Sequence, residues 1–539
     1  MHSGTIDQHG TQLCNFYPHV ESLEDVQDIE ENLISSYVQI QLGFEDGKSS
    51  TQTMQITELD RAQWLGMDKR CWFNPEVSKT KISRYLEKIV RSQLDSAPRK
   101  KIYQANGPGI FIIEGEPVFY TGFEVIRSPV SAAPHEIIMQ QRGKKNLDID
   151  TGLSEGEAVS GMFDLISLSS APGRVILIYQ ILCLMRAAYV EAGKRPNFCI
   201  YLYGKTGTKK TTFSSFLTQV YDRGKGIASP PRLNASIPAA VEMMSDIAED
   251  AIIFDDLYPA ESNRIRKQQE ETLVEITRII GDGTVPARLR GKKVTFDSPK
   301  CGVIFTGEYV IGSGSDAARL LPIEMLPPDG ERLKYFQDHP LLVSTFYYFF
   351  IRWFIANYKE IVELLKEWLC NYRKIDLGVH ARLQETHFFM ISAFAILMQY
   401  CVEKNFLSHV DAIRLHGSFR NLITELVRQQ DRQVQQSGSG SLKVQDYWGS
   451  MRELYKSGQL SVASCIDQFD VEVHDGLLHK NRLYFRRDKL LRYFPGSAIE
   501  DLVNALDAQG VLEKGEKNRT KQLSGLNGMR FYVIPLDHF

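Results

Sequence analysis

Hydrophobic and polar positions alternate near the start of the chain and then change period. Apolar and polar residues alternate on both sides of a Glu-Asp-Gly-Lys turn over residues 37–56, a pattern that predicts a β-hairpin. Apolar residues near a 3.6-residue period predict a helix over residues 78–94, and short apolar runs predict two strands within residues 110–121. We therefore expect a small α+β domain over residues 1–150.

Longer apolar runs dominate the next part of the chain. Residues 155–193 predict two apolar helices, the second over about 171–192. Three later apolar runs, at residues 198–203, 251–254 and 302–306, predict buried strands that end in polar side chains. Because buried strands alternating with helices are typical of a parallel sheet, we expect an α/β core over residues 151–330.

The remaining chain predicts two further parts. Residues 331–436 have a helical pattern rich in aromatic residues, which indicates a packed helical lid more than a stacking surface. A Ser/Gly-rich stretch at residues 435–441 predicts a flexible linker. A helix at 497–509, a strand at 511–513, a basic loop and a closing strand then predict a winged helix within residues 442–539. Winged helices bind DNA or proteins, so both kinds of partner stay open.

Composition narrows the class of protein. The 539 residues include 63 Lys or Arg and 66 Asp or Glu, so any nucleic-acid contact must come from local basic patches. Eight cysteines without a C-x-x-C pair argue against a zinc ribbon or disulfide framework and favour the reducing cytoplasm. The N-terminus is polar, and the most apolar runs are short for a bilayer. We expect a cytoplasmic protein with no membrane partner.

The candidate chemistry begins after the apolar run at 198–203, where a glycine-bearing loop opens a helix. In a phosphate-binding loop, backbone N–H groups cradle the phosphates of ATP, a lysine reaches the β and γ oxygens, and a hydroxyl holds Mg²⁺. Lys210 is the expected phosphate lysine and Thr211 the expected Mg²⁺ ligand. ATP contacts are expected from the whole loop: Gly204, Lys205, Thr206, Gly207, Thr208, Lys209, Lys210, Thr211 and Thr212. A plain Gly/Lys-rich turn is the alternative, and Lys209 stands where a glycine is usual.

Polar residues also follow the other two predicted core strands. Asp255 is expected to bind Mg²⁺, and Asp256 to polarise the attacking water. An acidic turn without chemistry is the alternative interpretation. At the end of the third strand, Thr306 is expected to sense the γ-phosphate, with Glu308 nearby. Lys210, Asp255, Asp256, Thr306 and Arg319 form the predicted catalytic set.

Two arginines are candidates for contacts with nucleotide. Arg319 precedes an apolar strand and could face the nucleotide of a neighbouring subunit, where it would neutralise charge as phosphate leaves. A structural salt bridge is the alternative for this residue. Arg382 opens an apolar helix of the lid and could reach back to the nucleotide.

Two basic segments are candidate DNA contacts. A hairpin over residues 285–296 carries Arg288, Arg290, Lys292 and Lys293 at its tip, which predicts a grip on a nucleic-acid backbone; a solvated surface hairpin is the alternative. The predicted wing carries Lys517, Arg519 and Lys521, with Lys514 beside them.

The motif order GKTGTKKTT, AIIFDD, GDGTVPARLRGKK, VIFTGE and AARLLPIE resembles the AAA+ P-loop ATPases of prophages and mobile elements. Among them it resembles the MCM-like helicases of chromosomal cassette elements, best over residues 100–330. The resemblance implies a hexameric ring with nucleotide at subunit interfaces and the basic hairpin in a central pore around single-stranded DNA. It also implies other replication proteins of the element as partners. Lys209 and Asp256 depart from the family pattern, which bears on the rate of hydrolysis.

The residues lead to the hypothesis of an ATP-dependent DNA helicase or translocase, and the resemblance implies that it acts as a ring and helps to replicate a mobile element or prophage. The alternative is a nucleotide-switched initiator or loader that binds DNA and hydrolyses slowly. A small-molecule kinase is disfavoured because the sequence shows no motif that would activate a phosphate acceptor.

Overall fold

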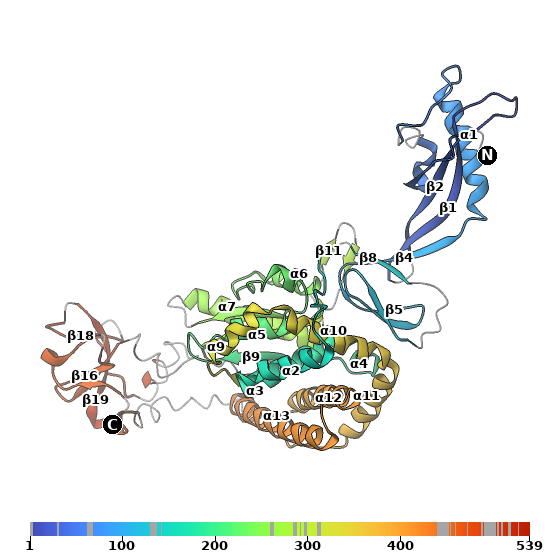
Figure 1. Cartoon of the computed structure of the whole chain (residues 1–539). Coiled ribbons are helices and arrows are strands. Elements are labelled where there is room, and N and C mark those ends of the chain that lie inside the picture. Colours follow the sequence, from blue (N-terminus) through green and yellow to red (C-terminus); the bar gives the residue numbers. More distant parts are fainter. Residues whose placement is uncertain are drawn as a thin grey trace. The chain divides into compact units, whose positions relative to one another are not determined.

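A computed structural model gives the structure of the chain (Figure 1). It describes residues 4–29, 32–61, 68–129, 137–141, 143–258, 263–283, 288–290, 293–295, 299–309, 314–438, 452, 454–458, 460–471, 473–486, 489, 503, 506–507, 510–515, 519–526 and 528–538. The chain divides into two compact units. One comprises Met1–Asp148 with Tyr348–Tyr358, and the other comprises Ile149–Tyr347 with Lys359–Phe539.

The first unit contains a five-stranded sheet in the order β3-β2-β1-β4-β8. Its strands are β1 (Phe16–Gln27), β2 (Leu33–Phe44), β3 (Ser49–Gln55), β4 (Arg99–Ala105) and β8 (Ile138–Gln141). The predicted hairpin is confirmed, since β2 pairs antiparallel with β3. The sequence did not predict β1, because register shifts between Val20 and Ser22 and between Val26 and Gln27 interrupt its alternation.

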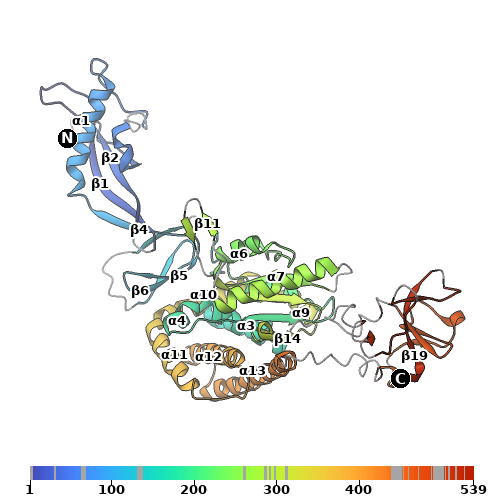
Figure 2. The same ribbon diagram turned by 180° about the vertical axis from the view of Figure 1, so that it is seen from behind.

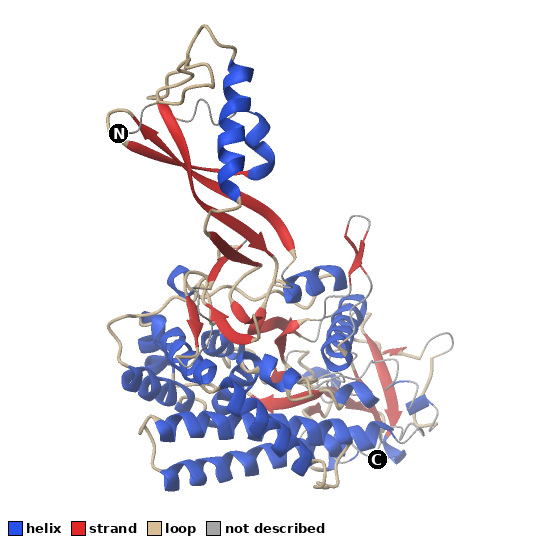
Figure 3. Ribbon diagram, turned by 90° about the vertical axis from the view of Figure 1, so that its right-hand side faces the viewer, coloured by secondary structure: helices blue, strands red, loops and turns tan. Residues whose placement is uncertain are grey.

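One amphipathic helix, α1 (Lys79–Leu94), packs against this sheet (Figure 3). The Ser78 hydroxyl accepts a hydrogen bond from the Lys81 N–H, which caps the first turn as expected for a helix N-terminus. Ile82, Leu86 and Val90 are fully buried in the core that the helix shares with β1 and β2. A separate three-stranded sheet contains β5 (Gly109–Ile113), β6 (Glu116–Tyr120) and β7 (Val125–Arg127).

The second unit contains a wholly parallel sheet in the order β10-β13-β9-β14. Its strands are β9 (Cys199–Tyr203), β10 (Ala248–Leu257), β13 (Lys300–Gly307) and β14 (Leu320–Glu324). All four strands are largely buried, which explains the unbroken apolar runs in the sequence. β13 therefore lies between the strand that opens the glycine-bearing loop and the strand that ends in two aspartates.

Helices cover both faces of this sheet (Figure 1 and Figure 2). One face packs against α3 (Ser170–Leu184), with α2 (Glu155–Ser167) and α5 (Lys210–Thr218) beside it, and the other against α6 (Ile237–Ser245) and α7 (Asn263–Asp282). The sequence predicted a single helix over 171–192. In the structure it breaks at Met185 (φ −89°, ψ 6°), and α4 (Arg186–Glu191) follows.

Long helices follow the sheet: α9 (Gly330–Asp338), α10 (Leu341–Ala356), α11 (Tyr358–Tyr372), α12 (Ala381–Glu403) and α13 (His409–Gly438). α11, α12 and α13 lie side by side (Figure 1). Among the described helices, α12 is long and apolar enough to cross a membrane, and 72% of its most apolar window is buried in the fold, as in the core helices of soluble proteins. Within this bundle His387 is buried between the Tyr372 hydroxyl, at 2.6 Å, and the Thr424 hydroxyl, at 3.0 Å.

The C-terminal part forms a sheet in the order β15-β16-β17-β19-β18. Its strands are β15 (Val462–Ala463), β16 (Gly476–His479), β17 (Arg482–Phe485), β18 (Lys521–Gln522) and β19 (Arg530–Pro535). The predicted closing strand is confirmed as β19, but residues 511–513 do not form the predicted strand, and β17 pairs with β19 instead. The predicted helix at 497–509 lies mostly outside the described residues. The β16–β17 hairpin was missed, although Lys480 and Asn481 have the positive φ angles, 48° and 60°, of a two-residue hairpin turn.

Candidate nucleotide-binding site

Three residues of the loop after β9 have positive φ angles, which favour glycine. Gly204 has φ 154°, and a Cβ there would lie 2.9 Å from the Met325 carbonyl oxygen, so no larger residue fits without a shift. Gly207 has φ 85°. Lys209, the N-cap of α5, also lies in the left-handed region, at φ 56° and ψ 29°. The lysine that departs from the sequence pattern therefore occupies a conformation that favours glycine.

Lys210 is folded onto this loop. Its Nζ donates hydrogen bonds to the carbonyl oxygens of Gly204, at 2.8 Å, and Lys205, at 3.0 Å. Partial burial lowers the pKa of Lys210, and the negative charges of Glu308, Asp255 and Asp256 oppose that shift. The ammonium group is thus held where loop carbonyls and carboxylates converge, and an anion could take over the carbonyl contacts.

Three elements meet at one oxygen of Asp255. The Thr211 hydroxyl, on the first turn of α5, donates to Asp255 Oδ1 at 2.6 Å. The Thr306 hydroxyl, near the end of β13, donates to the same atom. The structure therefore brings together the loop helix, the acidic strand and the strand between them, as the strand order requires for parallel strands that end at one edge.

The donor set at this point fits Mg²⁺. Among the described residues, no group of three or more His, Cys, Asp or Glu side chains could hold a metal ion. Thr211 and Asp255 instead offer a hydroxyl and a carboxylate in contact. Mg²⁺ is commonly held by one or two protein oxygens together with phosphate and water, so this pair suits a metal that arrives with a nucleotide.

Asp256, next along β10, has an unusual environment. Its φ is 75°, outside the range that residues with a side chain prefer, and its carbonyl accepts a hydrogen bond from Gln269 Nε2 at 3.1 Å. Burial, and then the neighbouring charge of Asp255, raise the pKa of Asp256. A carboxylate in this state holds a proton more readily than an ordinary aspartate does.

Glu308 contacts the loop directly. Its Oε1 accepts a hydrogen bond from the Thr206 hydroxyl at 2.5 Å, so a third carboxylate lies beside the loop after β9. Sequence reasoning placed both residues near the site but did not predict this contact. It depends on how far β13 extends relative to β9, which the motif spacing does not give.

The two candidate arginines lie together near the starts of the parallel strands, at the end away from the loop. Arg319 precedes β14 and its carbonyl accepts a hydrogen bond from the Cys199 N–H at the start of β9, so about five residues of strand, roughly 16 Å, separate it from the loop. Only 6% of Arg319 is exposed, and it donates to Asp282 at 2.7 and 3.0 Å and to Asp316 at 3.1 Å. Arg382 also reaches Asp282, at 3.4 Å. The structure thus brings Arg382 to Arg319 and its acids, while a role for Arg319 at a neighbour's nucleotide stays a prediction.

The predicted basic hairpin is present. β11 (Arg288–Arg290) and β12 (Lys293–Thr295) pair antiparallel, with Arg290 opposite Lys293. Lys292, at the turn, lies outside the described residues. The pairing confirms the hairpin, and its contact with DNA stays a prediction.

The basic residues of the predicted wing face acids of their own domain. Lys514 and Arg519 form ion pairs with Asp507, at 2.6 and 3.4 Å, and Lys521 pairs with Glu513 at 2.6 Å. Hydrogen bonds from Arg482 and from Lys521 lower the pKa of Glu513. Lys517 lies outside the described residues. These cations are partly neutralised before any partner binds, which favours neither DNA nor protein.

Arg223 supports the site and was missed by sequence reasoning. It is fully buried beyond the C-terminal end of α5. There its Nε donates to the Gln219 carbonyl at 2.5 Å and its Nη1 donates to the Pro340 carbonyl at 2.9 Å. The other Nη donates to the Phe216 carbonyl, and burial lowers the pKa of Arg223 to about 10. Its polar neighbours in the sequence, Asp-Arg-Gly-Lys-Gly, indicate an exposed turn, so no sequence signal marks this role.

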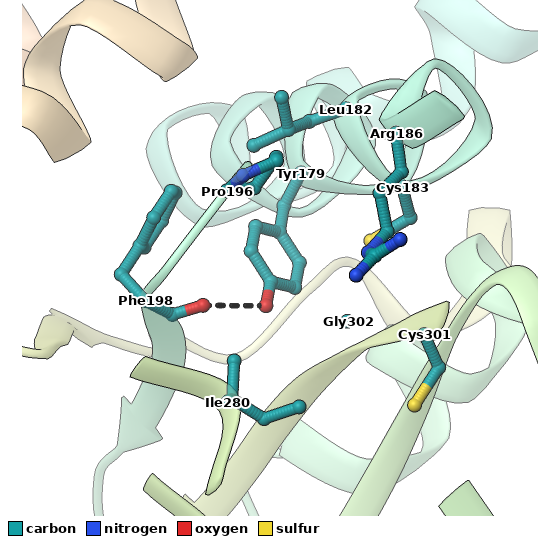
Figure 4. Close-up of a pocket in the computed structure, with 9 residues that line it drawn as sticks. All are labelled: Tyr179, Leu182, Cys183, Arg186, Pro196, Phe198, Ile280, Cys301 and Gly302. Carbon is teal, nitrogen blue, oxygen red and sulfur yellow. Dashed lines mark hydrogen bonds between the residues drawn. The ribbon is translucent and has the colours of Figure 1, made fainter. Parts of the chain in front are cut away.

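A small pocket near the starts of β9 and β13 is too small for a ligand (Figure 4). It measures about 20 Å³, room for about one water, and lies between Tyr179, Arg186 and Gly302. The Tyr179 hydroxyl donates to the Phe198 carbonyl at 3.0 Å across its wall. Burial raises the pKa of the Cys183 thiol beside it, so this cysteine is an inert core residue.

Comparison with known proteins supports the fold. The chain matches no protein-family model and no curated protein sequence. It is similar to the solved structure of the SCCmec type IV Cch protein, described as an active helicase, with TM-score 0.52 and 15% identity over 98% of this chain and 94% of that one. Weaker matches are the NrS-1 C-terminal region, with TM-score 0.30, 11% identity and coverage of 77% and 90%, and the JCV helicase, with TM-score 0.22, 14% identity and coverage of 44% and 72%. This chain has a helicase-like fold.

Proposed function

We propose that this chain is an ATP-dependent DNA helicase or translocase that acts as a hexameric ring in the replication of a mobile element or prophage. The observation that carries the proposal is the meeting of Thr211, Asp255 and Thr306 beside the Lys210 loop, within a helicase-like fold. Residues 151–330 would be an AAA+ core and 331–436 its lid, with a winged helix in 442–539. The motif order that resembles MCM-like helicases supports the ring.

In this proposal each residue has a definite task. Lys210 leaves the loop carbonyls and neutralises the β and γ oxygens of ATP, while Thr306 contacts the γ-phosphate. Water attacks the γ phosphorus, the bond to the β–γ bridging oxygen breaks, and ADP and phosphate leave; Asp256 receives the proton from the water. Mg²⁺ held with Thr211 and Asp255 would neutralise charge on the phosphate oxygens.

The alternative, a switch that hydrolyses slowly, has its own support. Lys209 holds the loop in a left-handed conformation that costs a residue with a side chain about 1 kcal/mol or more. Asp256 is one methylene shorter than the usual glutamate and has a positive φ, so it positions the attacking water less well. Both features concern steps of turnover more than they concern nucleotide affinity, so they favour an initiator or loader that uses ATP for assembly.

ATPase measurements test the proposal. The full chain, with Mg²⁺, low salt and single-stranded DNA, should hydrolyse ATP, and a Lys210→Ala variant should not. Equal rates of ATP hydrolysis for the two proteins would refute the proposed ATPase activity. Unwinding of a forked duplex separates the helicase from the switch, because the switch predicts nucleotide binding and slow hydrolysis without unwinding.

Oligomeric state and pore contacts need their own measurements. Particle images with a non-hydrolysable nucleotide and DNA should show closed rings, and a stable monomer would contradict the ring. Alanine at Arg288, Arg290, Lys292 and Lys293 should weaken single-stranded DNA binding and reduce its salt dependence.

A further inference from the structure

Helix α1 in the first unit carries a basic stripe that no task described above uses. Between residues 79 and 101 the chain has eight Lys or Arg and only two acidic residues, although its overall charge is −3. At 100° per residue, Lys81, Arg84, Lys88 and Arg91 fall on one side of the helix. That side lies opposite the buried side of Ile82, Leu86 and Val90, and all four cations are exposed.

Two of these cations are uncommitted within the described part of the chain. Lys81 lies 3.5 Å from Asp7, and Arg91 donates to Glu87 at 2.7 Å. No ion pair with a described residue holds Arg84 or Lys88, at the centre of the stripe. Arg84 and Lys88 can therefore pair with an external anion, and Lys81 and Arg91 add positive charge on either side of them.

The stripe continues beyond the helix. Arg99, Lys100 and Lys101 open β4, the strand that follows α1, and all three are exposed. Arg99 lies 3.6 Å from Asp25 and Lys101 pairs with Glu114 at 2.6 Å. β4 pairs with β1, the strand against which α1 packs, so these cations extend the positive charge at one end of the same small domain.

The geometry points to a nucleic-acid backbone as the partner. From Lys81 to Arg91 the helix rises about 15 Å, which covers roughly four phosphates of one strand at about 3.4 Å of duplex axis each. A membrane surface is the other common partner of a basic helix, but such a helix inserts an apolar side into lipid. The apolar side of α1 is already buried in the core.

We propose that α1 of the first unit is a second DNA-binding surface, which grips the phosphate backbone without reading sequence. Its contacts come from point charges on flexible side chains, and backbone contacts position a protein without specifying bases. The surface belongs to the first unit, whereas the candidate nucleotide site and the β11–β12 hairpin belong to the second. It rests on the proposed function only in taking DNA as the nucleic acid.

The test uses the full chain and a fluorescein-labelled 30-base-pair duplex of random sequence, with binding followed by anisotropy between 50 and 300 mM salt without nucleotide. An Arg84→Gln/Lys88→Gln variant should lower the slope of log K against log salt by about 1.8, which at 0.1 M salt is a roughly 60-fold loss of affinity. A Lys48→Gln/Lys366→Gln control removes two exposed cations elsewhere and should bind as the wild type does.

Two further measurements make the result decisive. Arg84→Lys/Lys88→Arg keeps the charges and should keep the slope, which excludes an effect through folding. ATPase without DNA should match the wild type in all variants, so failure of the ATPase proposal is seen separately. An unchanged slope in Arg84→Gln/Lys88→Gln overturns the proposal. The proposal is also overturned if this variant loses binding to phosphatidylserine vesicles but still binds DNA as the wild type does.

Discussion

Arg319 gives the sharpest prediction about the core, because its two interpretations lead to different measurements. Its side chain is 7% exposed and pairs with Asp282, 42% exposed, and Asp316, 19% exposed. Breaking a buried pair costs about 3–5 kcal/mol, because a charge is left without its partner. Since Asp282 can rehydrate in part, we expect Arg319→Ala to lower the free energy of unfolding by about 3 kcal/mol.

Arg278 provides a matched control. It pairs with the same Asp316, at 2.9 Å, but its side chain is 52% exposed. Arg278→Ala should therefore lower the free energy of unfolding much less than Arg319→Ala does. Denaturant unfolding of both variants, followed by tryptophan fluorescence, measures the difference.

ATPase rates decide between the interpretations. A structural Arg319 predicts that activity falls in step with stability, and that mixing Arg319→Ala with Lys210→Ala subunits restores nothing. If Arg319→Ala is no less stable than Arg278→Ala, yet inactive alone and active in such mixtures, the ion-pair reasoning is refuted and the residue acts on a neighbour's nucleotide.

Three further predictions concern strain, pH and the phosphate loop. Lys209→Gly should stabilise the core by about 0.5–1 kcal/mol in denaturant unfolding, because relief of the left-handed strain exceeds the entropy that glycine adds to the unfolded chain; a loss of stability would contradict it. Burial, and then Arg420 and Arg428, lower the pKa of His387 to about 4, whereas this histidine takes up a proton near pH 6.5 in the unfolded chain. The free energy of unfolding should therefore fall by up to about 3 kcal/mol between pH 6.5 and 4. A His387→Gln variant with the same pH profile would show that another group causes the loss. Glu308→Gln should tighten binding of a fluorescent ATP analogue about three- to tenfold by removing negative charge beside Thr206, and unchanged affinity relative to a Glu363→Gln control would show that the carboxylate does not oppose the phosphates.

The parts of the fold that were predictable carry a short-range signal. The positions of the loop after β9, of the aspartates near the end of β10 and of the threonine of β13 were predictable, because apolar runs that lead into polar residues repeat the same pattern. The parallel pairing of these strands then brings Thr211, Asp255 and Thr306 together. Local periodicity was likewise sufficient for α1 and for the β2–β3 hairpin.

The parts that the sequence left open or missed depend on long-range contacts. Whether Arg319 faces a neighbouring subunit or its own acids depends on where α7 ends, since Asp282 is the last residue of that helix. Likewise, the contact of Glu308 with Thr206 depends on the relative ends of two strands that lie a hundred residues apart in the sequence. Strand β1 was not predicted because an inserted residue reverses the alternation of apolar and polar residues on which the prediction of a strand relies.

The buried guanidinium of Arg223 has a consequence for which substitutions the α/β core can tolerate. Helix α5 has only nine residues, too few to be stable by itself, so its direction is set by what holds its two ends. A planar fork can satisfy three carbonyls at once, whereas an ammonium at that depth would have to lose its proton or draw in water. Lysine here would therefore loosen the far end of the helix, and with it the aim of the loop that is expected to receive the triphosphate.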